Sequence, residues 1–165
     1  MGEKEKIKHI IINLNDIKPI KMTFIDLKQI IEIYKSIWGE RGIYDPLTFM
    51  ETMSQGLSYV YKIEDEVIAF CLVEYINENN IIEIVLLCVK EEYRHNHLGK
   101  SLLSFCINNC RSKKYNRFSL HVSTTNIPAL NLYKKLGFVI KQCIKQYYND
   151  EDPKANDAYY MTLGT

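Results

Sequence analysis

Three neighbouring segments rich in Val, Ile and Tyr constrain the fold of this chain more than any other feature. They cover residues 57–63, 66–76 and 80–89, and the polar stretches "EDE" and "NENN" lie between them. β-Branched and aromatic residues are enriched in strands, and short polar links between such runs are typical of hairpins. The sequence therefore predicts three successive strands in an antiparallel meander.

Further elements are expected on both sides of this meander. Apolar residues at helical spacing and cap residues indicate helices, and Val- and Ile-rich runs indicate strands. The expected helices cover residues 23–38, 46–55, 99–114 and 126–137, and the other expected strands cover residues 9–14, 117–123, 138–148 and 157–163. The order is strand, two helices, three strands, helix, strand, helix and two strands, which predicts an α/β (α+β) fold class.

Cap residues support three of the expected helices. Thr23 or Asp26 can cap the first helix, and Pro46 stands at the expected first helical position of the second. Asn126 can cap the fourth helix, and Gly137 stands at its expected end.

Length and charge exclude several classes of protein. A chain of 165 residues suits one domain, so residues 1–165 are expected to fold as a single domain. Twenty-one Lys and Arg against 20 Asp and Glu leave a net charge of +1. With so small a net charge, no global field draws the protein to nucleic acid or to an anionic membrane, and we expect neither as a partner.

The five cysteines are odd in number, form no CxxC pair and stand in apolar stretches, which predicts buried free thiols. Free thiols are typical of a reducing, intracellular compartment. The longest apolar runs reach only strand length, well short of the roughly 20 residues that a spanning helix needs. We therefore expect a cytoplasmic protein, with a nuclear location also open.

The stretch "RHNHLGK", residues 94–100, stands where the last strand of the meander gives way to a helix. The first backbone N–H groups of such a helix lack partners, and the positive end of its dipole faces outward. Arg94 and Lys100 add positive charge that a diphosphate would neutralise. A capped helix with solvated basic residues is the alternative, because Gly99 is the single glycine of the stretch.

Motifs along the chain resemble those of the GNAT acetyltransferases. "RHNHLG" resembles their RxxGxG/A signature, with His97 in place of the first glycine, and "SLHVSTTNIPALNLYKKLGF" resembles their second acetyl-CoA motif. The tail "KQYYNDEDPKANDAYYM" is similar to the ending of protein N-terminal acetyltransferases, and "LHVSTTN" looks like the catalytic subunits of NatE and NatF. The resemblance covers about residues 59–163.

This resemblance implies a GNAT fold, in which a mixed, mostly antiparallel sheet of six to seven strands is flanked by four helices. It implies that the fourth and fifth strands splay apart and that acetyl-CoA, the co-substrate, fills the gap with its pantetheine arm. The residues expected to bind the coenzyme are Leu87, Cys88, Val89, Arg94, His95, Asn96, His97, Leu98, Gly99, Lys100, Asn126 and Tyr133.

Three side chains are expected to carry the chemistry, because direct attack on a thioester needs a base for the amine and an acid for the thiolate. Glu83 takes the register of the general-base glutamate of GNAT histone acetyltransferases. His121 takes that of a histidine in NatE and NatF enzymes, and Tyr133 that of the tyrosine that faces the coenzyme sulfur. On pattern alone, a solvent-facing glutamate, a structural histidine and a core tyrosine are the alternatives.

Four aromatic residues are expected at the substrate site. Tyr147 and Tyr148 match the paired tyrosines that wall the peptide entrance in the family. Trp38 and Tyr44 lie near the loop between the first two helices, which forms the other wall. Aromatic residues at element ends also serve plain packing, so packing is the alternative for each.

No metal is expected in the site. His95 and His97 flank a single asparagine, and two histidines provide too few ligands for a zinc ion. The cysteines stand apart from them and form no metal-binding spacing.

The expected acceptor is a protein N-terminal α-amine. Its pKa is about 8 against about 10.4 for lysine, so about one α-amine in ten is neutral at pH 7, against fewer than one lysine in a thousand. Two weak bases, Glu83 and His121, suit the easier amine, although Glu83 keeps a lysine acetyltransferase open. The NatE and NatF pattern has a tyrosine where this chain has Glu83, and the loop "IWGERGIYDP" is more polar than theirs.

Two other functions stay open. "LGKSLLS" and "NLYKKLGF" also look like glucosamine-6-phosphate acetyltransferases, and Arg41, Lys62 and Lys145 could bind the sugar phosphate. Alternatively, the domain is a catalytically silent acetyl-CoA sensor or an assembly subunit, because a β-carbon at His97 restricts positive φ and crowds the pyrophosphate. The sequence does not distinguish a homodimer from a chain that works with an auxiliary subunit.

Overall fold

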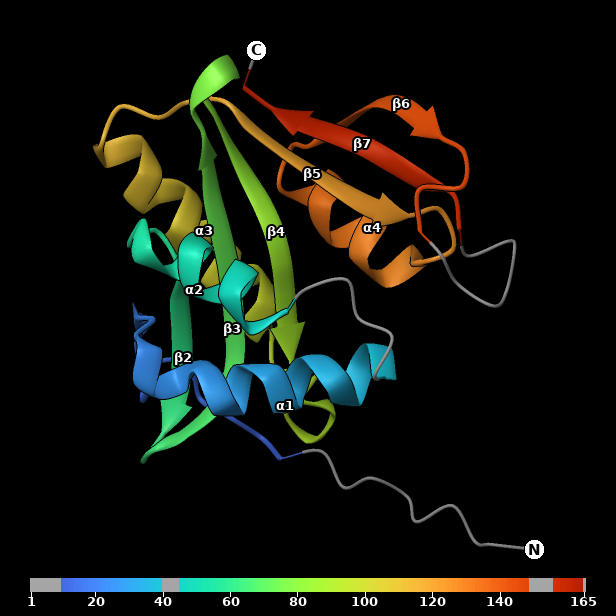
Figure 1. Cartoon of the computed structure of the whole chain (residues 1–165). Coiled ribbons are helices and arrows are strands. Elements are labelled where there is room, and N and C mark those ends of the chain that lie inside the picture. Colours follow the sequence, from blue (N-terminus) through green and yellow to red (C-terminus); the bar gives the residue numbers. More distant parts are fainter. Residues whose placement is uncertain (1–9, 40–44, 149–155, 165) are drawn as a thin grey trace, which may run out of the picture. The chain divides into compact units, whose positions relative to one another are not determined.

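The computed structural model describes residues 10–39, 45–148 and 156–164, which hold four α-helices and one seven-stranded sheet (Figure 1). The helices are α1 (Leu27–Trp38), α2 (Pro46–Ser54), α3 (Leu98–Ser112) and α4 (Ile127–Lys135). The strands are β1 (Ile20–Lys21), β2 (Tyr59–Ile63), β3 (Glu66–Ile76), β4 (Ile81–Val89), β5 (Phe118–Ser123), β6 (Val139–Ile144) and β7 (Ala158–Leu163). The predicted fold class and the predicted order of elements are confirmed.

The first strand lies elsewhere than the sequence predicts. β1 occupies Ile20–Lys21, whereas residues 10–14 are not in a strand, so the prediction of a strand at residues 9–14 is wrong for all of it that the structure describes. The physical reason is that this apolar run bonds its backbone to a loop instead of to a neighbouring strand. Ile10 N–H, for example, donates to Glu92 O at 2.7 Å.

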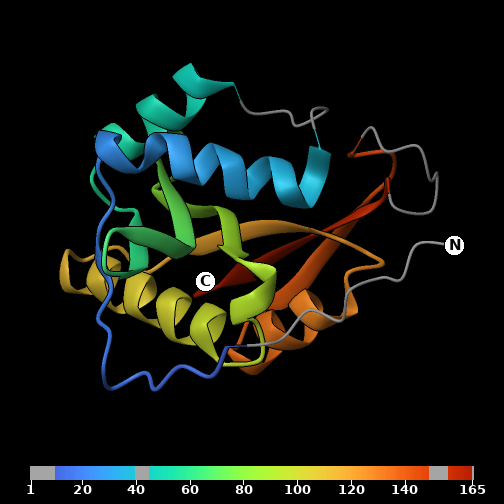
Figure 2. The ribbon, with the colours of Figure 1, turned by 90° about the horizontal axis from the view of Figure 1, so that it is seen from below.

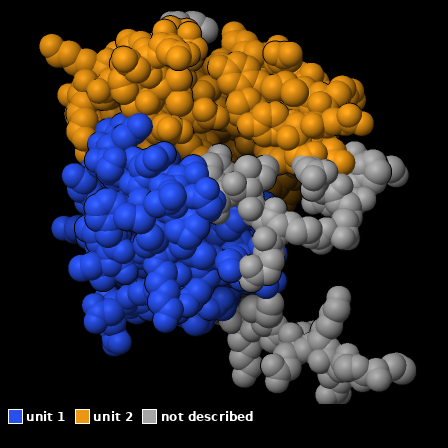
Figure 3. Space-filling view, viewed as in Figure 1, with its two compact units in different colours: residues 1–72, 86–106 blue, residues 73–85, 107–165 orange. Residues whose placement is uncertain are grey.

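The chain divides into two compact units, coloured separately in Figure 3: residues 1–72 with 86–106, and residues 73–85 with 107–165. In the first unit, α1 and α2 cover one face of β2 and β3, and the start of α3 covers the other (Figure 2). Both faces of β3 are therefore covered, and residues 67–72 are fully buried. That the whole chain is a single domain stays a prediction.

Asp26 stands at the N-cap position of α1 and Pro46 is the first residue of α2, as the sequence predicts. Thr23 N–H donates to the Asp26 carboxylate at 2.9 Å, ahead of α1. Asp45 accepts a hydrogen bond from Thr48 N–H at 2.9 Å, and Pro46 follows as the first residue of α2.

In the second unit, β5, β7 and β6 form an antiparallel ladder, and α4 lies against it (Figure 1). Alternation along β5 decides which side chains face the core. Phe118, Leu120 and Val122 are buried. His121 therefore lies on the opposite face of the strand, where it is partly exposed.

β4 and β5 pair in parallel within the second unit. The register places Ile82 opposite Phe118, Glu83 opposite Ser119 and Ile84 opposite Leu120. β2 with β3, β5 with β7 and β6 with β7 are antiparallel, so the sheet is mixed and mostly antiparallel. The expectation of six to seven strands and four helices is thus confirmed.

All five cysteines are free, and four are buried: Cys71, Cys88, Cys106 and Cys110. The prediction of buried thiols is wrong for Cys143, which is exposed because it lies on β6, the edge strand of the sheet. Among the described residues, none of the helices is both long and apolar enough to cross a membrane.

Candidate active site

Glu83 and His121 form a hydrogen-bonded pair on one face of the second unit. Ser119 stands opposite Glu83 in the parallel ladder, and His121 follows two residues later on the same face. Glu83 Oε1 and His121 Nδ1 are 3.0 Å apart. The side chains are 26% and 21% exposed, respectively, so both remain accessible while partly shielded. The structure thus joins the two bases expected from the sequence into one dyad.

Two tyrosine rings flank the His121 imidazole. Tyr147 stacks on it, with ring centroids 4.5 Å apart and planes inclined by 10°. Tyr160 stands opposite His121 in the β5–β7 ladder, and its ring centroid lies 5.1 Å away. Tyr148 meets Tyr147 edge-on at 4.9 Å. The imidazole is therefore oriented by a carboxylate at one nitrogen and by rings packed against it.

Asp157 fixes the turn that carries Tyr147. Its carboxylate lies 2.6 Å from Lys145 Nζ and accepts a hydrogen bond from Gln146 N–H at 3.1 Å. Gln146 has φ +51°, a conformation that non-glycine residues rarely adopt without support. The hydrogen bonds from Lys145 and Gln146 hold the pKa of Asp157 below its ordinary value. The two residues before Tyr147 are thus tied to the residue that precedes β7.

The Tyr147 phenol is a weaker acid than an ordinary tyrosine. Burial, and then the negative charge of Glu83, raise the pKa of Tyr147 above its ordinary value, so its phenol keeps its proton near neutral pH. In the tautomer whose Nδ1 donates to a Glu83 carboxylate, Nε2 is the ring nitrogen that can accept a hydrogen bond.

Asn126 and Tyr133 belong to α4. The Asn126 side chain accepts a hydrogen bond from Ala129 N–H at 3.2 Å and caps the helix, as the sequence predicts. Tyr133 is 8% exposed, and its ring meets Phe138 edge-on at 5.9 Å. Those contacts agree with a packing role, and its role as the acid stays a prediction.

The expected coenzyme-binding stretch begins at the end of β4. Leu87 and Val89 are half-buried, and Cys88 is buried. Burial raises the pKa of the Cys88 thiol far above its ordinary value, which makes it an inert packing residue instead of a nucleophile. Arg94 Nε donates to Val89 O at 3.2 Å, so this side chain is bonded to the end of the strand.

The loop before α3 adopts its turn without the usual glycine. His95 has φ +66° and His97 has φ +58°. Histidine is among the residues that reach this left-handed region more often than other side chains do. Ser101 N–H donates to His97 O at 3.0 Å, so the helical bonds begin there. The β-carbon of His97 was expected to restrict positive φ, but His97 adopts a positive φ in the structure.

The first turn of α3 fits a diphosphate by its donor set. Leu98 is buried and anchors the turn, while Gly99 is half-buried and Lys100 is exposed. Backbone N–H groups at the start of a helix have no carbonyl acceptor one turn earlier. With the exposed Arg94 nearby in sequence, this end of α3 combines unpaired donors with positive charge.

The other expected substrate wall is described in part. Trp38 ends α1, is 45% exposed, and its ring lies 4.8 Å from that of Tyr34. Tyr44 and Arg41 lie outside the described residues.

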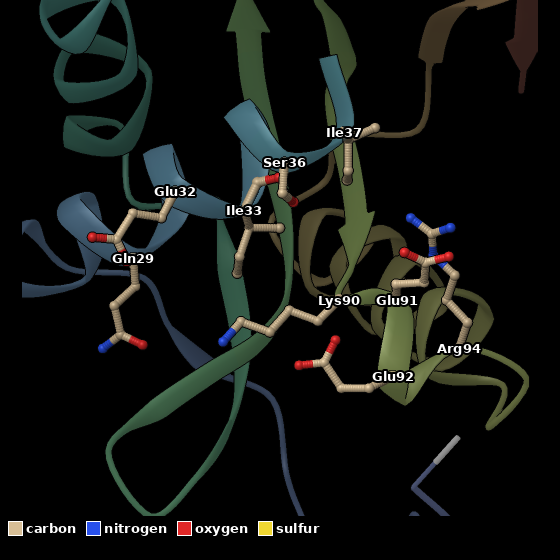
Figure 4. Close-up of a pocket in the computed structure, with 9 residues that line it drawn as sticks. All are labelled: Gln29, Glu32, Ile33, Ser36, Ile37, Lys90, Glu91, Glu92 and Arg94. Carbon is tan, nitrogen blue, oxygen red and sulfur yellow. The ribbon is translucent and has the colours of Figure 1, made fainter. Parts of the chain in front are cut away.

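A cavity of about 280 Å³ lies in the first unit, between α1 and the segment that follows β4 (Figure 4). Its lining carries charges of both signs. The lining residues are Gln29, Glu32, Ile33, Ser36, Ile37, Lys90, Glu91, Glu92 and Arg94. Neither Glu83 nor His121 lines this cavity.

Metal ligands do not gather in the part of the chain that the structure describes. There, no three His, Cys, Asp or Glu side chains form a group that could hold a metal ion. His95 and His97 are exposed loop residues.

Sequence reasoning missed Tyr160 and Asp157. Alternation along "DAYYM" could have placed both on the faces of a strand, but it does not say which strand lies beside it. Tyr160 contacts His121 only because β7 pairs with β5 in a particular register. The bonds of Asp157 depend on the closing of the β6–β7 hairpin, which local sequence does not specify.

The mixed sheet with its parallel β4 and β5, the four helices and the Glu83–His121 pair on adjoining strands are the arrangement expected of an acetyltransferase. Residues 27–138 match the acetyltransferase (GNAT) family, and the chain belongs to that family. It is therefore an enzyme, an acetyl-CoA-dependent N-acetyltransferase of the GNAT type.

Named relatives extend this comparison. The chain is 31% identical over 158 residues to an N-alpha-acetyltransferase of Sulfolobus acidocaldarius, which covers 84% of this chain and 87% of that protein. It is 37% identical over 73 residues to a Bacillus subtilis protein named for ribosomal protein bS18-alanine N-acetylation, which covers 44% of this chain and 48% of the relative. In fold it is similar to Arabidopsis thaliana Naa50 in complex with the bisubstrate analogue CoA-Ac-MVNAL, with a TM-score of 0.76. The two chains are 22% identical, and the match covers 90% of this chain and 99% of that one.

Proposed function

We propose that this chain acetylates protein N-terminal α-amines, with His121 as the general base and Glu83 as the residue that positions it. The observation that carries the proposal is the 3.0 Å contact between His121 Nδ1 and Glu83 Oε1, with Tyr147 stacked on the imidazole. The Sulfolobus relative is named as an N-alpha-acetyltransferase, and the Naa50 structure holds a peptide-bearing bisubstrate analogue. These names support the same class of acceptor.

The chemistry of the dyad fits an α-amine better than a lysine. The difference of about 2.4 units between their ordinary pKa values corresponds to about 3 kcal/mol that a lysine acetyltransferase must supply. A neutral imidazole is a weak base that works well near pH 7, provided that the acceptor already loses its proton easily. An N-terminal amine meets this condition.

We assign the coenzyme diphosphate to the first turn of α3. Backbone N–H groups of Leu98, Gly99 and Lys100 supply hydrogen bonds, and Arg94 supplies charge. The β4 segment Leu87 to Val89 would hold the pantetheine arm by its backbone. When bound, acetyl-CoA supplies the activated acetyl thioester that the amine attacks.

Each side chain of the dyad has a distinct task. His121 Nε2 accepts the proton of the attacking amine, directly or through an ordered water, while Nδ1 keeps its bond to Glu83. The carboxylate of Glu83 stabilises the imidazolium that forms. Tyr133 is the proposed donor of a proton to the departing thiolate.

A coenzyme-release assay tests the proposal across three acceptor classes: N-terminal peptides, lysine peptides and amino sugars. We expect turnover with N-terminal peptides, large losses with His121→Ala and Glu83→Gln, and little change in coenzyme affinity measured by calorimetry. Preferential turnover of lysine peptides or amino sugars would contradict the proposed acceptor. Coenzyme binding without turnover of any acceptor would instead support a silent sensor.

The small-amine alternative has less support from the structure. Lys62 forms an ion pair with the buried Asp26, and Lys145 forms one with Asp157. Two of the three cations considered for a sugar phosphate are therefore already neutralised within the chain, and Arg41 lies outside the described residues. Phosphate recognition by Lys62 or Lys145 would have to break the ion pair of that lysine.

A further inference from the structure

We propose that the segment of residues 10–12 is a working part of the coenzyme site, because it clamps Asn96 and so holds the loop before α3 in its strained conformation. We call the hydrogen bonds that join Asn96 to Ile10 and Ile12 the Asn96 clamp. The inference rests on the proposed coenzyme site at the start of α3 and goes beyond it, since it assigns a positioning role to a segment outside every family motif.

The geometry of the Asn96 clamp is reciprocal. Ile12 N–H donates to Asn96 Oδ1 at 2.9 Å, and Asn96 Nδ2 donates back to Ile10 O at 2.6 Å. Ile10 N–H donates to Glu92 O at 2.7 Å. The segment before β1 accordingly reaches the loop before α3, as both ribbon views show (Figures 1 and 2). The oxygen and the nitrogen of one side-chain amide thus join residues more than 80 positions apart in the sequence.

The clamp acts where the loop is strained. Asn96 stands between His95 and His97, both at positive φ. Such conformations cost energy for residues with a β-carbon and persist only when their surroundings hold them. Asn96 Nδ2 also donates to Tyr93 O at 3.0 Å, so the amide ties the loop to itself as well as to the segment of residues 10–12.

The Asn96 clamp explains how the loop keeps its conformation with His97 in place of a glycine. A glycine at position 97 would adopt φ +58° without strain, and the loop would need less outside support, with His95 alone still at positive φ. With His97, the loop needs hydrogen-bond partners that stabilise this conformation relative to the alternatives. The segment of residues 10–12 supplies them without contributing a side chain to the proposed diphosphate site.

Proline substitution tests the clamp in the full-length chain. Ile12→Pro removes the N–H that Asn96 accepts. Ile12→Ala keeps this N–H but loses the side chain, and Ile11→Pro places the same ring at a residue that is 92% exposed and whose N–H takes no part in the clamp. We expect coenzyme A to bind about five- to tenfold more weakly to Ile12→Pro than to either control, the loss of about one hydrogen-bonded contact.

A readout without coenzyme separates positioning from direct binding. Hydrogen exchange of the backbone amides of residues 95–99 should quicken in Ile12→Pro and stay near the wild-type rate in Ile12→Ala. If Ile12→Pro does not fold, Asn96→Ala removes the other partner and permits the same two measurements.

A double-mutant cycle with His97→Gly gives the sharpest test. In the glycine background, Ile12→Pro should weaken coenzyme binding by clearly less than in the native background, because the strain at position 97 has gone and only that at His95 remains. An equal penalty in both backgrounds would overturn the inference. Affinity unchanged by Ile12→Pro in the native background would also overturn it while leaving the proposed function intact, whereas a wild-type chain that binds no coenzyme would overturn both.

Discussion

His121 Nδ1 lies 3.0 Å from Glu83 Oε1, and the two residues come from adjacent parallel strands, two positions apart in register. A pair held by two strands keeps its geometry better than a pair on loops, because neither backbone can shift alone. We propose different tasks for these two residues, which the sequence patterns present as two weak bases.

His121→Ala should therefore lower kcat with N-terminal peptides by about 100-fold or more, the usual worth of a general base. Glu83→Gln should lower it by about tenfold to 100-fold through loss of orientation. If the residues act as one unit, the double variant is no slower than His121→Ala alone. Steady-state kinetics measure all three, with Lys141→Ala on the exposed face of β6 as the control. Additive losses would show that the two bases work independently.

Tyr147 should matter by its ring and not by its hydroxyl group. Tyr147→Phe keeps the stack on His121, so its kcat should stay within about threefold of wild type, whereas Tyr147→Ala should lose about tenfold. Since its raised pKa lies above the ordinary value of 10.0, Tyr147 keeps its proton below that pH, and the pH–rate profiles of wild type and Tyr147→Phe should coincide up to pH 9.5. A basic limb that disappears in Tyr147→Phe would assign the proton transfer to the phenol.

Asp157→Asn should lower Tm in a pH-dependent way. The folded pKa of Asp157 is depressed, so its contribution to stability is present above the unfolded pKa, at about pH 4, and is lost as pH falls through the folded value. The Tm difference between wild type and Asp157→Asn should thus be constant from pH 5 to 8 and close below about pH 4. Thermal scans across pH measure it, and a gap that widens in acid would contradict the assignment.

Gly164→Ala should destabilise the fold more than Gly39→Ala. Both glycines have positive φ, +76° and +71°, which costs a residue with a β-carbon about 1 kcal/mol or more. A β-carbon at Gly164 would also stand 2.0 Å from Asn116 O, whereas one at Gly39 meets nothing within 4 Å. The free energy of unfolding in urea should fall by at least about 1 kcal/mol more for Gly164→Ala. Equal losses would mean that the chain end yields without cost.

The elements that the sequence predicts well are those whose signals are local. Alternation and short polar links place the strands of the meander, and Asp26 and Asn126 at N-cap positions and Pro46 at a first helical position mark the helix starts. The strand expected at residues 9–14 failed because an apolar run says nothing about its partner, and here the partner is the side chain of Asn96.

The same limit applies to the site. Glu83 and His121 stand out as polar residues in apolar strands, but their contact follows from the parallel register of β4 and β5. Asp157 and Tyr160 act through the β6–β7 hairpin and the β5–β7 ladder, and both depend on pairings between distant segments. The roles of Tyr133, Trp38 and Tyr148 stay predictions, because their contacts fit packing equally well.

The burial of the cysteine thiols has a practical consequence for work on this enzyme. Four of the five cysteines are buried in the native chain, and Cys143 alone is exposed. A disulfide reagent that titrates liberated coenzyme will therefore meet one exposed cysteine thiol per folded molecule and five per denatured one. The absorbance that measures coenzyme release will also measure the thiols of denatured enzyme. The denatured fraction of each preparation can therefore be determined before the acceptor is added.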